Sequence, residues 1–137
     1  MAFDPTSDYP LGTRRPDLVS TPGGIPLEDV TLGALRAGEL GADEMRATPE
    51  TLRMQAEVAL AAGRTQLAES FERAAELAAV PDDLLLQVYT ALRPRRATAP
   101  ELEEWASRLD GHEATKTAAF VREAAAAYAA RGLLADE

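Results

Sequence analysis

The sequence predicts an all-α fold: a small helical bundle, with one long helix and shorter helices, preceded by an extended N-terminal arm. Three observations lead to this class. Apolar residues recur at helical spacing from residue 49 onward, residues that cap helices recur between these segments, and no strand pattern stands out. The 137 residues suffice for one domain with a modest core. Because alanine supplies much of the apolar content, we expect a thin core that favours support from a partner.

Residues 1–30 are interpreted as an extended, partner-docking arm, and residues 31–137 as the helical domain. Prolines interrupt the arm too often for a helix interior. The arm nevertheless keeps apolar side chains, among them Tyr9, Leu11 and Leu18. A disordered tail normally lacks such residues, because it buries nothing. We therefore expect the arm to reach outward and to be covered by another chain.

The helical domain is expected to begin with short elements. Thr31 predicts a cap for a helix through Arg36 that ends at Gly38, and a further turn is expected at 42–46. The sequence Thr48-Pro49-Glu50 is the clearest helix start. The apolar spacing then continues on one face past Gly63, which predicts a single helix over about 49–79.

Three shorter elements are predicted to complete the bundle. A helix begins at Pro81 and stops at Pro94, with an apolar face made of Leu84, Leu85, Val88, Tyr89 and Leu92. Thr98 and Glu101 predict a capping box for a helix that ends near Gly111. The last helix is expected over about 112–131, with Gly132 as its C-terminal cap. No internal repeat stands out.

Charge and composition exclude several classes of function. A formal net charge of −9 argues against nucleic acid and against anionic membrane surfaces as partners. The absence of cysteine removes disulfides, thiolate nucleophiles and zinc–sulfur sites. No signal peptide is evident, and no apolar run approaches the roughly 20 residues that span a bilayer. The sequence therefore predicts a soluble, cytoplasmic protein.

Candidate catalytic groups are sparse. His112 is the only histidine, and we interpret it as a solvated residue at a helix start, with a catalytic or metal-binding role as the less favoured alternative. Paired carboxylates could bind a divalent cation or act as acid and base, but their positions in first helical turns or on an exposed face favour a structural role. These pairs are Asp43-Glu44, Asp82-Asp83 and Glu103-Glu104.

The arginines gather in two places. Arg93, Arg95 and Arg96 surround Pro94, and Arg14 and Arg15 lie in the arm. They either serve solubility and helix C-terminal charge, or pair with carboxylates on a partner subunit. The candidate partner-interface residues are Tyr9, Pro10, Leu11, Arg14, Leu18, Arg93, Pro94 and Arg95.

Four segments resemble one protein family. DYPLGTRRPDLVSTPGGIPLEDVTL, ATPETLRMQAEVA, FERAAELAAVPDDLLLQVYTALRPRRAT and AAFVREAAAAY occur in this order within residues 8 to 131. They resemble the small (gamma) subunit of adenosylcobalamin-dependent diol dehydratase and glycerol dehydratase. The most specific parts are RAAEL followed by PDD and YTALRPRR, and DYPLGTR followed by its turn.

The resemblance implies a role as part of a hetero-oligomer with two copies each of a large, a medium and a small subunit. It implies that the large subunit holds the substrate and that adenosylcobalamin lies between the large and medium subunits. The implied reaction converts 1,2-propanediol, glycerol or ethylene glycol to an aldehyde and water by a radical mechanism. The small subunit packs on and stabilises the large one, so no catalytic, cofactor-binding or metal-binding residue is assigned to this chain.

Two further expectations accompany the resemblance. Family members often carry a longer N-terminal extension linked to packaging in a bacterial microcompartment, whereas DYPLGTR begins here at Asp8. A cytoplasmic location inside or outside such a compartment is therefore expected. The alternative function, a stand-alone helical adaptor, leaves the segment from PDD to LRPRR unexplained.

Overall fold

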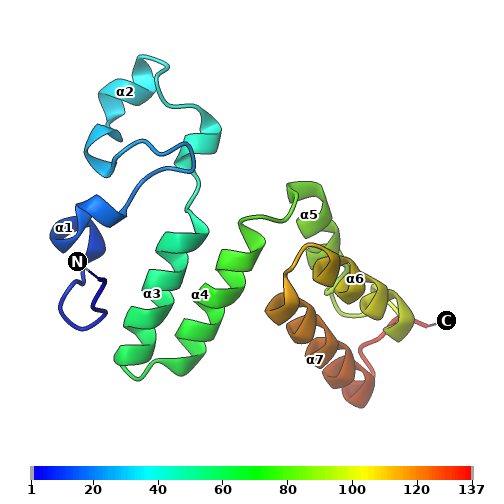
Figure 1. Cartoon of the computed structure of the whole chain (residues 1–137). Helices are drawn as coiled ribbons and strands as arrows, with labels where there is room; N and C mark the ends of the chain where they lie inside the picture. Colours follow the sequence, from blue (N-terminus) through cyan, green and yellow to red (C-terminus); the bar gives the residue numbers. More distant parts are fainter. Residues whose placement is uncertain (1, 137) are drawn as a thin grey trace. The chain divides into compact units, whose positions relative to one another are not determined.

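The computed structural model describes residues 2–136, and its regular structure is helical (Figure 1). Among those residues no strand is assigned, and Ser20 and Pro26 form an isolated antiparallel bridge. The predicted all-α class is confirmed. In chain order the elements are α1 (Leu11–Arg14), η1 (Pro16–Leu18), η2 (Leu27–Asp29), α2 (Leu32–Arg36), η3 (Ala42–Met45), α3 (Pro49–Ala61), α4 (Thr65–Leu77), α5 (Asp82–Ala91), α6 (Ala99–Gly111) and α7 (Thr115–Arg131).

The chain divides into two compact units, the first ending at Ala78 and the second starting at Ala79. The first unit holds α1 to α4, and the second holds α5 to α7. This division differs from the predicted one between residues 1–30 and 31–137, because the arm groups with α2, α3 and α4. That residues 1–30 dock on a partner stays a prediction.

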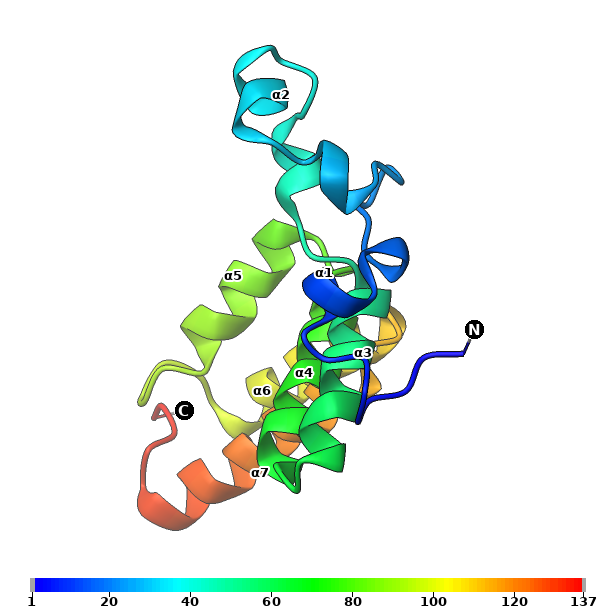
Figure 2. The same ribbon diagram turned by 90° about the vertical axis from the view of Figure 1, so that its left-hand side faces the viewer.

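The helix predicted over 49–79 is wrong, because this segment forms two helices that fold back on each other. Gly63 has a φ of 73°, a left-handed conformation that ends α3. The Arg64 N–H then donates to the Ala59 carbonyl at 2.8 Å, which closes the turn. The two helices lie side by side in Figures 1 and 2. They bury only part of the predicted apolar face, since Ala56 and Ala59 are buried whereas Leu60 and Leu67 are 60% and 41% exposed.

The core of this α3–α4 hairpin is thin, as the alanine content predicts. Ala56, Ala59 and Ala68 are buried, with exposed fractions of 3 to 7%, and the partly buried Phe71 packs against them. Small side chains at the contact allow two helices to approach closely, but they bury little apolar area.

The second unit contains a second hairpin, formed by α6 and α7. The predicted capping box is confirmed, since the Thr98 N–H donates to the Glu101 carboxylate at 2.8 Å and the Thr98 hydroxyl accepts from the Glu101 N–H. The last helix begins at Thr115 rather than near His112, because Glu113 takes a left-handed conformation with a φ of 60°. The largest fully buried side chains of the hairpin are Leu102 and Leu109 of α6 and Val121 of α7.

The two hairpins have the same local structure, with corresponding residues 50 positions apart, such as Thr48 and Thr98. The sequence analysis did not predict this repeat. Each hairpin begins with a threonine cap and has a left-handed residue in its turn, at Gly63 and at Glu113. The hydrogen bond from Arg64 to Ala59 recurs from the Ala114 N–H to the Leu109 carbonyl at 3.0 Å. The corresponding buried pairs are Ala56 and Ala106, Ala59 and Leu109, and Ala68 and Ala118.

The remaining elements agree closely with the sequence. The Thr31 hydroxyl accepts a hydrogen bond from the Ala34 N–H at 3.1 Å and caps α2, while η3 occupies the predicted turn. Gly132 has a φ of 66° and terminates α7. The Tyr128 hydroxyl donates to the Leu92 carbonyl oxygen and ties α7 to the end of α5. No helix within the described range is long and apolar enough to cross a membrane.

Candidate docking surfaces

The polar groups considered in the sequence lie at helix ends or on exposed helix faces. His112 is exposed at the C-terminal cap of α6, not at the start of the last helix as predicted, and Asp82 and Asp83 occupy the first turn of α5. Glu103 accepts hydrogen bonds from Arg122, which lowers the pKa of its carboxyl group. Between residues 2 and 136, no group of three or more histidine, aspartate or glutamate side chains could hold a metal ion.

The candidate interface residues of the arm differ in exposure. Tyr9 is 53% exposed, Pro10 and Arg14 are also exposed, and Leu18 is half-buried. Leu11 is only 3% exposed, because other residues of the chain cover it. In this conformation Leu11 contributes to the fold of the arm, whereas the Tyr9 ring is accessible to a partner.

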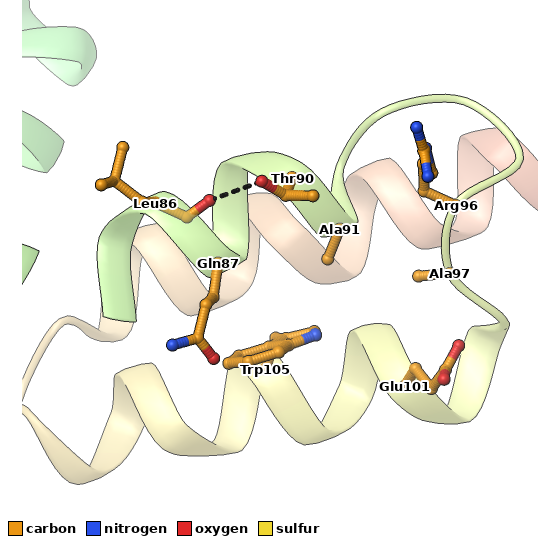
Figure 3. A pocket seen from close by; sticks show the side chains of 8 residues that line it. All are labelled: Leu86, Gln87, Thr90, Ala91, Arg96, Ala97, Glu101 and Trp105. Carbon is orange, nitrogen blue, oxygen red and sulfur yellow. Dashed lines mark hydrogen bonds between the residues drawn. The ribbon is translucent and has the colours of Figure 1, made fainter. Parts of the chain in front are cut away.

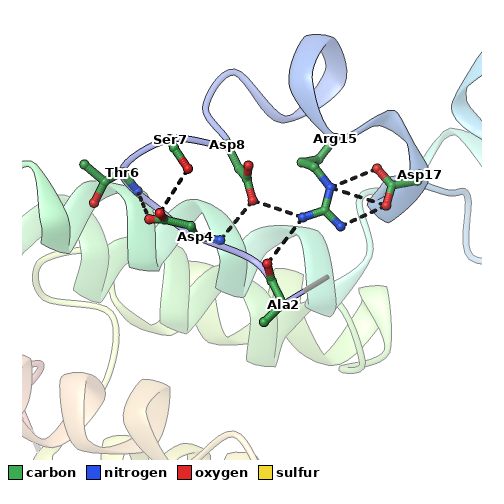
Figure 4. Close-up of polar contacts among 7 residues, drawn as sticks. All are labelled: Ala2, Asp4, Thr6, Ser7, Asp8, Arg15 and Asp17. Carbon is green, nitrogen blue, oxygen red and sulfur yellow. Dashed lines mark hydrogen bonds and ion pairs between the residues drawn. The ribbon is translucent and has the colours of Figure 1, made fainter.

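Arg15 organises the arm (Figure 4). Its guanidinium forms a bidentate pair with Asp17, with nitrogen–oxygen distances of 3.0 and 2.9 Å, and a further ion pair with Asp8 at 3.0 Å. These bonds hold the pKa of the Asp17 carboxyl below its usual range. Arg15 therefore pairs with carboxylates of its own chain, and the alternative of pairing with a partner subunit does not describe it.

Hydrogen bonds extend this order toward the N-terminus. The Asp4 N–H donates to the Asp8 carboxylate at 2.9 Å, and the Asp4 carboxylate accepts from the Thr6 N–H and the Ser7 hydroxyl (Figure 4). The arm thus has a defined local fold built from short-range polar contacts, rather than the irregular extended form expected from its prolines.

A groove lies between α5 and α6 in the second unit (Figure 3). It is an open groove of about 410 Å³, and the residues that line it include Leu86 and Thr90 from α5 and Trp105 from α6. Leu86 is 67% exposed, and the neighbouring Tyr89 is 54% exposed. The Arg108 guanidinium lies over the Trp105 ring, 4.7 Å from its centroid, and holds the indole in place.

The candidate residues Arg93, Pro94 and Arg95 are all exposed in the connection between α5 and α6. This connection has a fixed backbone. Arg95 takes a left-handed conformation with a φ of 61°, its N–H donates to the Leu133 carbonyl at 2.7 Å, and the Ala135 N–H donates to the Ala97 carbonyl at 2.9 Å. The next residue, Arg96, lines the groove.

Sequence reasoning missed the groove and its two main apolar residues, Leu86 and Trp105. One signal was present: three consecutive leucines, Leu84 to Leu86, cannot all face the same side of a helix. Leu84 is 4% exposed, so Leu86 points away from the core. The predicted apolar face of α5 included Leu84 and Leu85 and omitted Leu86.

The fold and these surfaces describe a helical protein with exposed apolar and basic side chains, and comparison with known proteins gives its class. The family model described as dehydratase small subunit matches residues 5–135, so the chain belongs to the dehydratase small-subunit family. The resemblance found in the sequence is confirmed.

Two relatives are similar over most of the chain. The propanediol dehydratase small subunit of Citrobacter freundii is 52% identical over 126 residues, which cover 91% of this chain and 73% of that protein. The propanediol dehydratase small subunit of Salmonella typhimurium strain LT2 is 51% identical with the same coverage.

Proposed function

We propose that this chain is the non-catalytic small subunit of an adenosylcobalamin-dependent diol dehydratase that converts 1,2-propanediol to an aldehyde and water. The observation that carries this proposal is the identity of 51 to 52% over 91% of the chain to two propanediol dehydratase small subunits. Glycerol and ethylene glycol belong to the same class of substrate and are included in the proposal. A cytoplasmic location, inside or outside a microcompartment, is proposed with it.

In this proposal the chain acts by binding and stabilising a large catalytic subunit, while a medium subunit completes the enzyme with two copies of each. When bound, adenosylcobalamin supplies the radical that starts the reaction. We assign its binding to the other subunits. The groove of this chain offers leucine, tryptophan and arginine side chains, and its single imidazole, His112, lies outside that groove on the exposed end of α6.

The surfaces described above fit a binding role. Tyr9 on the arm and Leu86 on α5 are more than half exposed, although each is large and apolar. Exposed apolar side chains of this size gain free energy when a partner removes them from water, by about 25 cal/mol for each Å² buried.

Co-expression tests the proposal. The chain would be expressed with the large and medium subunits of the Citrobacter freundii enzyme, with an affinity tag on the large subunit. We expect the chain to co-purify and the complex to form propionaldehyde from 1,2-propanediol only when adenosylcobalamin is added. A matched preparation without this chain should lose soluble complex or activity. Failure of the chain to co-purify would contradict the proposal.

A further inference from the structure

The outer face of α5 carries two large apolar side chains, although its inner face already belongs to the core. Leu84 and Val88 are 4% and 2% exposed and form the buried side of this helix. Leu86 and Tyr89, three residues apart on another side, are 67% and 54% exposed. A helix of a small protein that stands alone usually carries polar residues on its second face, so this side is suited to contact with another protein.

The opposite wall of the groove is also suited to binding. Trp105 projects from α6 toward the groove, as Figure 3 shows, and the Arg108 guanidinium stacks on its ring. A tryptophan that is only half-buried offers a large apolar surface at a small cost in side-chain entropy. Glu101 also lines the groove, but its carboxylate already accepts hydrogen bonds from Thr98 in the capping box.

One end of the groove is basic in a chain whose net charge is −9. Arg96 lines it, and Arg93 and Arg95 lie next to it in the same connection. Within residues 2–136, no hydrogen bond or ion pair engages the side chains of these three arginines. The backbone bonds of Arg95 and Ala97 to residues 133 and 135 fix the connection that presents them. The planar guanidinium group of arginine favours bidentate pairing with carboxylates.

We propose that this groove is the docking site for one amphipathic α-helix of a partner subunit, which carries carboxylates at one end. Its apolar side chains would lie against Leu86 and Trp105, and its carboxylates would pair with the arginines at 93, 95 and 96. A helix is the occupant that best fits a groove between two helices, because side chains spaced three and four residues apart enter it along one line. This inference rests on the proposed function, since it places the partner within the dehydratase complex.

Zero-length cross-linking tests the carboxylate contact directly. Lys116 is the only lysine of the chain, so Arg96→Lys adds one new amine at the groove and keeps the positive charge. The assembled complex would be treated with a water-soluble carbodiimide, which joins an amine to a carboxylate in contact with it. Mass spectrometry should find residue 96 joined to an aspartate or glutamate of a partner subunit. Arg36→Lys, on α2 in the first unit, is the matched control and should give no such product.

Affinity measurements test the apolar contact. Leu86→Asp should weaken binding to the partner subunits about tenfold or more, as expected for a side chain at the centre of an interface. Leu32→Asp is the matched control, because Leu32 is 61% exposed on α2 and lies outside the groove. The circular dichroism of both variants should equal that of the wild-type chain, since neither side chain is part of the core.

The outcomes separate the two proposals. If the wild-type chain does not assemble, the proposed function fails, and the docking site fails with it. If the wild-type chain assembles, three results would each overturn the docking site alone. These are cross-links of residue 96 only within this chain or to a second copy, no cross-link in an intact complex, and equal losses of affinity for Leu86→Asp and Leu32→Asp.

Discussion

Gly63→Ala should destabilise the α3–α4 hairpin through backbone conformation alone. Gly63 has a φ of 73°, and a Cβ atom built on it would meet no atom within 4 Å. The substitution therefore brings no steric contact, and its effect isolates the cost of a left-handed conformation for a residue with a side chain. That cost is roughly 1–2 kcal/mol, and the lower entropy of alanine in the unfolded chain offsets about half a kcal/mol of it. We expect the free energy of unfolding to fall by about 1 kcal/mol.

The repeat supplies a matched control for this prediction. Gly111 is the last residue of α6, corresponds to Ala61 of the first hairpin, and also has open space around a built Cβ. Its φ lies outside the left-handed range, so Gly111→Ala should raise the free energy of unfolding by about half a kcal/mol or more. The two variants make the same chemical change and should shift stability in opposite directions.

Urea unfolding of the full-length chain, followed by circular dichroism at a helical wavelength, measures both effects. The slope of the transition should stay constant, because neither variant alters the area exposed on unfolding. A neutral or stabilising Gly63→Ala would refute the reasoning. It would mean that the turn relaxes to another conformation at no cost, and that Gly63 does not determine where α3 ends.

Three further outcomes are expected. Thr98→Ala removes the capping box of α6 and should lower the free energy of unfolding by about 1 kcal/mol, measured in urea. Arg15→Met should raise the pKa of the Asp17 carboxyl to its ordinary range in an NMR titration. The folded-state pKa is lowered in the wild type, so this pairing stabilises the arm above the pKa of the unfolded carboxyl, about 4, and is lost as the pH falls below it. Leu11→Ala should destabilise the chain by about 2 kcal/mol or more, whereas Tyr9→Asp should weaken assembly and leave urea unfolding within about half a kcal/mol of the wild type.

Local signals predicted the elements well because each has a short-range physical cause. The caps at Thr31, Thr48 and Thr98 accept backbone hydrogen bonds within three residues, and Gly132 ends α7 through its own backbone conformation. Such features depend on a few neighbouring residues, so the sequence shows them directly.

The turn at Gly63 was missed because periodicity cannot distinguish a continuous helix from a hairpin. When a helix folds back after a short turn, the apolar face on each arm points toward the other, and the spacing of apolar residues survives. The second hairpin was recognised as two helices because Gly111 and His112 separate two apolar segments, although its second helix begins three residues later than predicted. Which residues of the arm and of α5 stay exposed depends on tertiary packing, and the exposure of Leu86 was for that reason not predicted.

The repeat itself has a sequence signal that was overlooked. Arg46-Ala47-Thr48 precedes the first hairpin, and Arg96-Ala97-Thr98 precedes the second at the same interval of 50 residues. Three identical residues at one spacing are a weak match, and the helices that follow differ in most side chains. The correspondence becomes clear only when the left-handed turns at Gly63 and Glu113 are compared.

Comparison of the two hairpins explains why each unit needs a segment in front of its hairpin. Two packed helices leave much of their apolar surface in water, so a third element must cover part of it. In the second unit α5 lies beside the start of α6, and the two enclose the groove lined by Arg96, Ala97 and Trp105. In the first unit, the equivalent place next to Arg46 and Ala47 is lined by arm residues, including Val19, Leu27 and Val30.

The arm therefore lies beside the first hairpin at the place that α5 occupies beside the second hairpin. We call both segments covers, although the arm consists of short helical turns and α5 is one helix. This accounts for the apolar residues of the proline-rich arm, part of which pack on the chain itself. It also leaves a defined remainder, since Tyr9 on one cover and Leu86 and Tyr89 on the other stay exposed. Leu60 and Leu67 on the first hairpin and Phe120 on the second are also exposed, so the apolar surface that a partner subunit would bury includes the hairpins as well as the arm and α5.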